Sequence, residues 1–191
     1  MKINIRLKYN APVVLTFVLF CFCVVLADML VNEKITHLLF STYRSSWLDP
    51  LTYPRLVTHV FGHADWSHFV NNTMYILLLG PMLEEKYGSK TLIYVMLITA
   101  VVTGLLNTLL FSNVALLGAS GIVFAFILLS SFTDFSAGDI PITVLIVAVI
   151  YIGQEVVDGI FLQDNVSNMA HIVGGVVGTV SGYAVNIRKN R

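Results

Sequence analysis

The chain has 191 residues, of which 57% are hydrophobic and only 12% are charged. A soluble domain of this length needs a more polar surface, so the composition indicates a polytopic membrane protein. The formal net charge is zero, which gives no support for nucleic-acid binding.

Apolar runs separated by polar stretches predict an all-α bundle of six membrane-spanning helices in one domain, residues 1–191. The expected spans are 11–31, 67–83, 91–111, 117–133, 140–157 and 168–187. The first run, after a basic stretch, resembles a signal peptide, but it is long enough to span and no small-residue cleavage pattern follows it. We therefore expect a retained helix. Within it, Cys21 and Cys23 point to different helix faces and should not pair with each other.

The placement of lysine and arginine predicts how the helices are oriented in the membrane. With the N-terminus in the cytoplasm, six spans return the C-terminus there, and most basic residues then lie inside. The inner set is Lys2, Arg6, Lys8, Lys86, Lys90, Arg188, Lys189 and Arg191, and the outer set is Lys34, Arg44 and Arg55. The long 32–66 loop then faces outside, and the fourth and sixth helices both begin from that side.

A quartet of small residues, Gly118-Ala119-Ser120-Gly121, opens the fourth apolar run. We expect Ser120 about one turn inside that helix, near free N–H groups and a positive helix end that suit a developing oxyanion. The glycines let a substrate or another backbone come close. Taken alone, the quartet fits a helix-packing face equally well, because small residues are common at helix contacts in membranes.

A histidine, His171, opens the sixth apolar run and is a candidate base for Ser120. A serine hydroxyl is a weak nucleophile until a base removes its proton, and imidazole can do so near neutral pH. Four glycines follow on the same helix and predict tight packing against the fourth helix, which would carry the imidazole towards Ser120. They are Gly174, Gly175, Gly178 and Gly182. A structural histidine bonded to a loop carbonyl is the alternative.

The second span begins with His68 and Asn72, which are four residues apart and share a helix face. Their N–H groups and the Ser120 backbone N–H are candidates to stabilise a tetrahedral oxyanion. A rival interpretation makes His59, His63 and His68 zinc ligands. The absence of an HExxH glutamate and of cysteine ligands near them disfavours it.

These motifs resemble the rhomboid intramembrane serine proteases in their minimal six-helix bacterial form, over nearly the whole chain. The family's Gly-x-Ser-Gly motif matches Gly118–Gly121, and its catalytic histidine, with glycines three and seven residues on, matches His171. Its His-x-x-x-Asn pair matches His68 and Asn72, not the adjacent Asn71.

Three further positions bear on the resemblance. Phe124 stands where relatives carry an aromatic residue that packs on the histidine ring. The stretch Gly80–Glu84 is similar to the turn that closes the second helix in the family. A departure occurs in the first outer loop, where Pro54-Arg55 replaces the Trp-Arg of relatives, so an aromatic anchor for Arg55 must come from elsewhere.

The resemblance implies a serine endopeptidase that cleaves the transmembrane segments of single-span membrane proteins. It implies a dyad without a third acidic member, in which Ser120 attacks the peptide carbonyl and His171 acts as general base and then general acid. His68 and Asn72 would stabilise the oxyanion. No metal or organic cofactor is expected. The implied location is the inner membrane, with multiple passes through the bilayer, both chain ends cytoplasmic and the active site open to the extracytoplasmic side. The oligomeric state stays open.

Two other functions remain as alternatives. The first is a catalytically silent rhomboid-like protein that binds membrane-protein clients; such proteins generally lack the serine or the histidine, and both are present here. The second is a small transporter with His171 on a proton path. That path needs carboxylates at membrane depth, and we expect the main candidate, Glu155, to have no matching basic partner.

Overall fold

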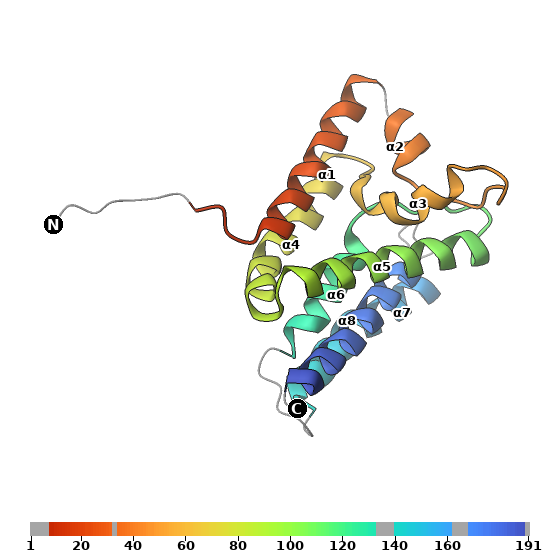
Figure 1. Ribbon diagram of the computed structural model, residues 1–191. Helices are drawn as coiled ribbons and strands as arrows, with labels where there is room; N and C mark the ends of the chain where they lie inside the picture. The colour runs from red at the N-terminus through yellow and green to blue at the C-terminus, as the bar shows by residue number, and fades with distance from the viewer. Residues whose placement is uncertain (1–7, 32–33, 133–139, 162–167, 190–191) are drawn as a thin grey trace, which may run out of the picture.

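The computed structural model describes residues 8–31, 34–132, 140–161 and 168–189, and these form a helical bundle with α6 near its centre (Figure 1). Its elements are α1 (Pro12–Leu30), α2 (Lys34–Leu39), α3 (Thr52–Thr58), η1 (His59–Phe61), α4 (Trp66–Tyr87), α5 (Ser89–Leu110), α6 (Ser120–Ser130), α7 (Ile142–Phe161) and α8 (Asn168–Lys189). Throughout the described residues the regular elements are helical, apart from one isolated bridge between Thr42 and Leu116. The all-α prediction is confirmed.

Within the described part of the chain, three helices are long and apolar enough to cross a membrane: α1, α5 and the Asn168–Ile187 part of α8. α6 and the Ile142–Val157 part of α7 are also apolar but shorter. The helices therefore support a membrane protein, while the count of six spans stays a prediction. The basic residues at positions 2, 6 and 191, used above for orientation, lie outside the described residues.

The observed bounds of α6, which begins with the candidate nucleophile, and of α7 differ from the predicted ones. The span expected at 117–133 begins only at Ser120, because Gly118 has φ +114 and so lies outside the helical region. The span expected at 140–157 starts after Pro141 and continues to Phe161. Residue 133 of the expected fourth span, and residues 162–167 between the expected fifth and sixth spans, fall outside the described part.

The second predicted span is longer than expected. The family-like turn at Gly80–Glu84 is wrong as a turn, because α4 continues through Pro81 and ends at Tyr87. The helix stops at Gly88, whose φ of +83 suits a residue without a side chain.

A carboxylate on α4 holds the start of α1. Glu84 is only 5% exposed, and its two carboxylate oxygens accept the backbone N–H groups of Val13 and Val14, each at 3.1 Å. The first N–H groups of a helix have no intrahelical acceptor, so the carboxylate satisfies their hydrogen bonds. Its negative charge also interacts favourably with the positive end of the helix dipole. Glu84 is therefore a structural acid.

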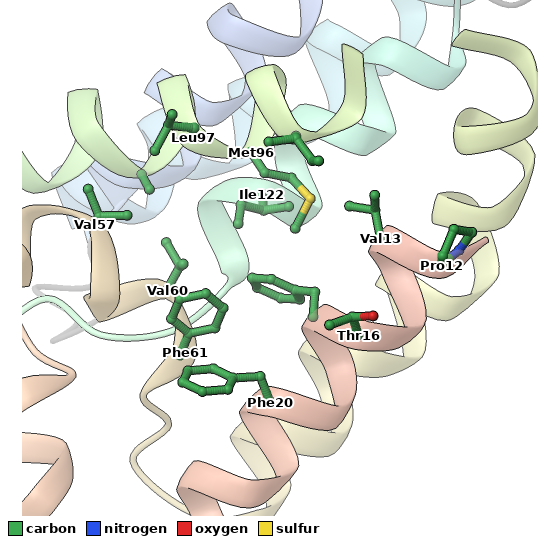
Figure 2. A pocket seen from close by; sticks show the side chains of 13 residues that line it. Pro12, Val13, Thr16, Phe20, Val57, Val60, Phe61, Met96, Leu97 and Ile122 are labelled. Carbon is green, nitrogen blue, oxygen red and sulfur yellow. The ribbon is translucent and has the colours of Figure 1, made fainter. Parts of the chain in front are cut away.

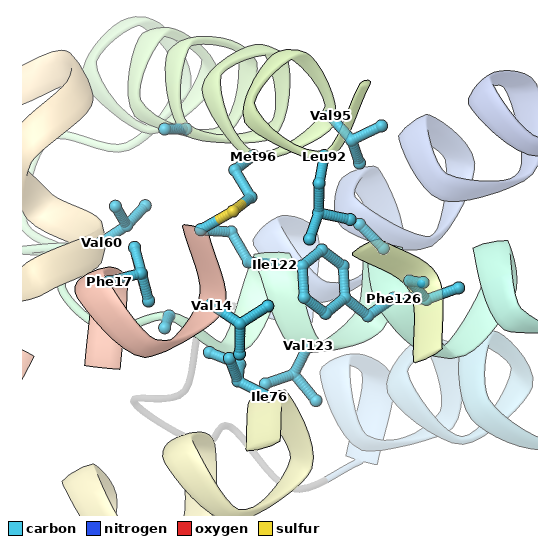
Figure 3. Close-up of a cluster of buried hydrophobic side chains, with 14 of the residues drawn as sticks. Val14, Phe17, Val60, Ile76, Leu92, Val95, Met96, Ile122, Val123 and Phe126 are labelled. Carbon is cyan, nitrogen blue, oxygen red and sulfur yellow. The ribbon is translucent and has the colours of Figure 1, made fainter. Parts of the chain in front are cut away.

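The core gathers apolar side chains of α1, α4 and α5 around those of α6 (Figure 3). Val14 of α1, Ile76 of α4 and Leu92 of α5 meet Ile122 and Phe126 of α6, and all five are fully buried. The outward face of the bundle is also apolar, since large side chains such as those of α7 are mostly exposed, as expected for contact with lipid. α6 is thus packed on several sides, which fixes the position of its first residue, Ser120.

Helices α6 and α8 pack along a seam of small residues, as the glycine spacing predicts. A Cβ placed on Gly174 would overlap the backbone of Gly121, and one placed on Gly178 would overlap the backbone of Ala125. Only glycine allows so close an approach of two helix backbones. The seam therefore sets the relative position of the first residues of α6 and α8.

The 32–66 segment, expected as a loop, contains α2, α3 and η1 and is braced by a buried arginine. Arg55 is 4% exposed. Its Nε donates to the carbonyl of Leu38 at 2.7 Å, and its Nη1 pairs with Asp49 at 3.2 Å. Its guanidinium lies 4.9 Å from the centre of the Tyr43 ring, so Tyr43 is the aromatic anchor that the sequence left unassigned.

An apolar groove of about 610 Å³ opens between α1, α5 and the α3–η1 segment (Figure 2). Phe20, Phe61 and Met96 line it, with Ile122 among the lining residues. Its lining contains one hydroxyl, that of Thr16, and no ionisable side chain. This groove has the character of a lipid-facing surface and carries no chemistry.

Candidate active site

A second hollow, of about 460 Å³, lies where α4, α6 and α8 begin. Its lining brings together all four residues predicted for the site, His68, Asn72, Ser120 and His171. Three helix N-termini thus converge on one pocket. Each helix start carries partial positive charge, an environment that favours a negatively charged intermediate.

Ser120 is the first residue of α6, not a residue one turn inside it as predicted from the sequence. Its side chain is half-buried at the pocket wall. Ala119 precedes it as the N-cap and supplies no side-chain hydrogen bond. The N–H groups of the first turn therefore lack both an intrahelical acceptor and a side-chain cap. They are available to a ligand beside the Ser120 hydroxyl.

The segment before Ser120 is fixed against its neighbours. The N–H of Gly118 donates to the carbonyl of His59 at 2.9 Å. A Cβ built on Gly118 would lie 2.7 Å from Nε2 of His68 and 3.5 Å from Nδ2 of Asn72. Glycine at this position therefore lets the chain pass directly over the two predicted oxyanion donors, at a φ of +114 that other residues rarely adopt.

The His171 ring is clamped on two sides. Its Nδ1 lies 2.8 Å from Oε2 of Glu155, and its face stacks on Phe124 with ring centres 4.5 Å apart and planes 5° from parallel. The predicted Phe124 contact is thus observed. The expectation that Glu155 has no basic partner is wrong, because α7 turns this carboxylate towards the start of α8. Among the described residues, no hydrogen bond joins Ser120 to His171, and catalytic contacts of this kind often tighten only when substrate binds.

His68 and Asn72 are oriented as hydrogen-bond donors. The Ala64 N–H donates to Nδ1 of His68 at 3.4 Å, which leaves Nε2 to carry the proton of a neutral ring. Asn72 is 6% exposed, and its Nδ2 has no hydrogen-bond partner. A buried amide N–H₂ without an acceptor is costly unless something else accepts its protons. A substrate oxyanion between these donors would do so.

The remaining histidines of the region have structural partners, His59 at both ring nitrogens and His63 at Nδ1, while the buried Nε2 of His63 has none. The ring nitrogens of His59 meet the carbonyl of Arg55 at 3.2 Å and the hydroxyl of Thr103 at 3.3 Å. Nδ1 of His63 meets the carbonyl of Phe61 at 3.2 Å, and burial lowers the pKa of His63 to about 4. No cluster of three or more histidine, cysteine, aspartate or glutamate side chains suited to a metal occurs within the described ranges. The zinc interpretation gains no support from this geometry.

Sequence reasoning missed the contacts that two residues make in the site. Asp65 lines the pocket and caps α4, its carboxylate accepting the N–H of His68 at 2.7 Å. The signal for it was present, since aspartate is a preferred N-cap residue immediately before a helix. Glu155 had no such signal, because its partner His171 lies 16 residues further on, in another helix.

Comparisons with known proteins show which family the chain resembles. A family model described as the rhomboid domain matches residues 50–188. The chain is 25% identical over 140 residues to the rhomboid protease GlpG of Haemophilus influenzae, covering 71% of this chain and 72% of that protein. It is 26% identical over 140 residues to the chloroplastic rhomboid-like protein 11 of Arabidopsis thaliana, covering 66% of this chain and 50% of that protein.

A third relative, the rhomboid-like protease 3 of Toxoplasma gondii, is 33% identical over 98 residues, covering 51% of this chain and 37% of that protein. The alignments thus span half or less of the length of the Arabidopsis and Toxoplasma proteins. The family model covers most of the chain, from the α3 region to the end of α8, and includes every residue of the pocket described above. The chain belongs to the rhomboid family.

Proposed function

We propose that this rhomboid-family chain is a serine endopeptidase that cleaves transmembrane segments of single-span membrane proteins. One observation carries the proposal. The Ser120 hydroxyl, at an uncapped helix N-terminus, shares a pocket with a His171 ring whose far nitrogen is held by a carboxylate. Nucleophile, base and positive helix end are the parts that acyl transfer requires.

The chemistry follows from the free nitrogen of the ring. With Nδ1 occupied by Glu155, Nε2 of His171 is the acceptor for the Ser120 proton. Oγ then bonds to the peptide carbon, and the carbonyl oxygen becomes an oxyanion stabilised by His68 Nε2–H, Asn72 Nδ2–H and backbone N–H groups of α6. The imidazolium returns the proton to the amide nitrogen as the C–N bond breaks. Water, deprotonated by the same ring, hydrolyses the acyl-enzyme.

The location belongs to the same proposal. Apolar helices support insertion in a membrane. The distribution of lysine and arginine favours cytoplasmic ends in an inner membrane. The pocket lies at the end of the bundle where α4, α6 and α8 begin, next to the braced 32–66 segment. That end is then extracytoplasmic, and water reaches the site from there.

Cleavage of a model single-span substrate by the purified protein tests the proposal. We expect the wild type to cut, Ser120→Ala to leave the substrate intact while keeping the wild-type thermal midpoint, and Ser130→Ala, at the opposite end of α6, to cut normally. Because no metal takes part, EDTA should not change the rate. Cleavage by Ser120→Ala at the wild-type rate would refute the nucleophile assignment. A wild type that binds the substrate without cutting it would favour the catalytically silent alternative.

A further inference from the structure

The contact between α7 and the candidate base goes beyond a serine–histidine pair. Oε2 of Glu155 lies 2.8 Å from Nδ1 of His171, with side-chain exposures of 13% and 9%. A carboxylate at membrane depth is unfavourable unless a partner compensates its charge. The imidazole that the proposed reaction charges is in direct contact with it.

We propose that Glu155 is a positioning residue for His171, so that this chain uses three groups, Ser120, His171 and Glu155, where the family resemblance implies two. The inference rests on the proposed endopeptidase function and deepens it. Glu155 touches neither substrate nor scissile bond; it acts through the ring.

The carboxylate can act on the ring in two ways. An ionised carboxylate only accepts hydrogen bonds, so it holds the proton of the neutral ring on Nδ1 and leaves the Nε2 lone pair towards the pocket. When Nε2 takes the Ser120 proton, the same carboxylate lies beside the new positive charge and stabilises it. These are the two roles of the acid in a serine-protease triad.

The surroundings hold Glu155 in that position. Tyr151, one helical turn earlier on α7, packs edge-on against Phe124 with ring centres 6.0 Å apart, and Phe124 in turn stacks on the His171 ring. Ile152 of α7 lies against Gly175 of α8. The inner face of α7 therefore places its carboxylate on the imidazole and its Tyr151 ring on Phe124, which stacks on that imidazole.

The neighbouring residue on α7 supplies a matched control. Gln154 is exposed and is not among the residues that line the pocket. Glu155→Gln removes the charge and the acceptor-only character at nearly constant shape, whereas Glu155→Asp keeps the charge at a shorter reach. Gln154→Ala changes α7 by a similar amount away from the site.

We expect Glu155→Gln to lower kcat by about 10- to 1,000-fold at unchanged KM, less than the roughly 10⁴-fold loss in kcat after such a change in a serine-protease triad. Glu155→Asp should retain more activity than Glu155→Gln, and Gln154→Ala should keep the wild-type rate. A wild-type kcat in Glu155→Gln would overturn the inference, as would a rise in KM alone, because Glu155 would then act in substrate binding.

A second measurement needs only the wild-type protein. Nitrogen-15 NMR of histidine-labelled protein, with His171→Gln to assign the signal, should show the neutral ring protonated at Nδ1. A ring protonated at Nε2 would contradict the inference even if Glu155 variants failed to fold. The two proposals can fail separately. Cleavage by Ser120→Ala refutes the proposed function. If Ser120→Ala does not cleave but Glu155→Gln is fully active, only the role of Glu155 is refuted.

Discussion

The α6–α8 seam and helix α7 both reach His171, but they are packed in different ways. Along the seam, the backbone of Gly178 lies so close to Ala125 that no side chain fits between the helices. On α7, a Cβ on Gly153 would meet nothing within 4 Å, and large side chains such as Val149 are 73% exposed. The α6–α8 seam thus fixes the positions of Ser120 and His171 by close backbone packing, whereas Glu155 comes from a sparsely packed outer helix.

This difference in packing corresponds to two different requirements for positioning the residues of the site. The proposed nucleophile and base need a distance held to a fraction of an ångström, which close backbone contact between α6 and α8 can supply. A group that acts through the base needs only to reach its far nitrogen, and a single hydrogen bond from a peripheral helix can do that. We therefore expect changes in the seam to affect folding and activity together, and on α7 we expect changes at Glu155 to affect activity through His171.

The strongest test of the comparison uses the same substitution in both regions. Gly178→Ala places a methyl group against the backbone of Ala125, which cannot rotate away. Overpacking of this kind typically costs about 1–3 kcal/mol, so we expect a lower melting temperature and loss of most cleavage activity. Gly153→Ala points into open space and should be neutral or stabilising by up to about 1 kcal/mol. Equal losses in both variants would contradict the packing difference.

Substitution of two adjacent asparagines on α4 tests which side chain of this pocket wall donates a hydrogen bond to the oxyanion. Asn72→Ala removes a buried, unpartnered N–H₂ group and should lower kcat by roughly 10- to 1,000-fold, the range found for removal of one oxyanion donor. Asn71 is exposed at the same pocket, so Asn71→Ala should have a clearly smaller effect. Steady-state kinetics on the model substrate measure both. The opposite order would assign the donor to Asn71.

Phe124 lies between the two regions, stacked on His171 and touching Tyr151 of α7. Aromatic contacts contribute about 0.5–1.5 kcal/mol beyond buried area, so Phe124→Leu should lower kcat by roughly 2- to 10-fold. Phe124→Tyr keeps the ring and should stay near the wild-type rate. If leucine and tyrosine behave alike, the stacked ring does not position His171.

Acid should loosen the bracing that holds the segment before Ser120. Burial lowers the pKa of His59 from its ordinary value of 6.5 to about 4 in the folded protein. Between these values the unfolded chain binds a proton that the folded protein does not, so stability falls as the pH drops from 6.5 towards 4. The melting temperature, measured over this range, should fall less steeply in His59→Gln. An identical slope in the variant would show that His59 does not contribute.

The helices and the pocket residues could be predicted because their signals are local. Apolar runs, the Gly118–Gly121 quartet and the glycines after His171 each lie within one segment of the sequence. The spacing of those glycines already implied a close α6–α8 contact. Helix ends were less accurate, since Gly118 fixes the start of α6 through its φ of +114, a property that the sequence only hints at.

The parts that could not be predicted depend on contacts between distant segments. Glu84 reads as a surface charge at the end of a span, yet it caps α1, about 70 residues earlier in the chain. Glu155 reads as an isolated acid, because nothing in α7 alone indicates that it faces His171. The sequence predicts that Arg55 takes an aromatic anchor from elsewhere, but which one, Tyr43, becomes visible only in the folded loop.

Labelling with a serine-reactive fluorophosphonate measures the reactivity of the Ser120 hydroxyl without a protein substrate. If His171 activates Ser120 as a nucleophile, the wild type is labelled, Ser120→Ala is not, and His171→Ala reacts at least about 100-fold more slowly, in line with the loss of a general base. Labelling of Ser120→Ala at the wild-type rate would show that Ser120 is not the nucleophile.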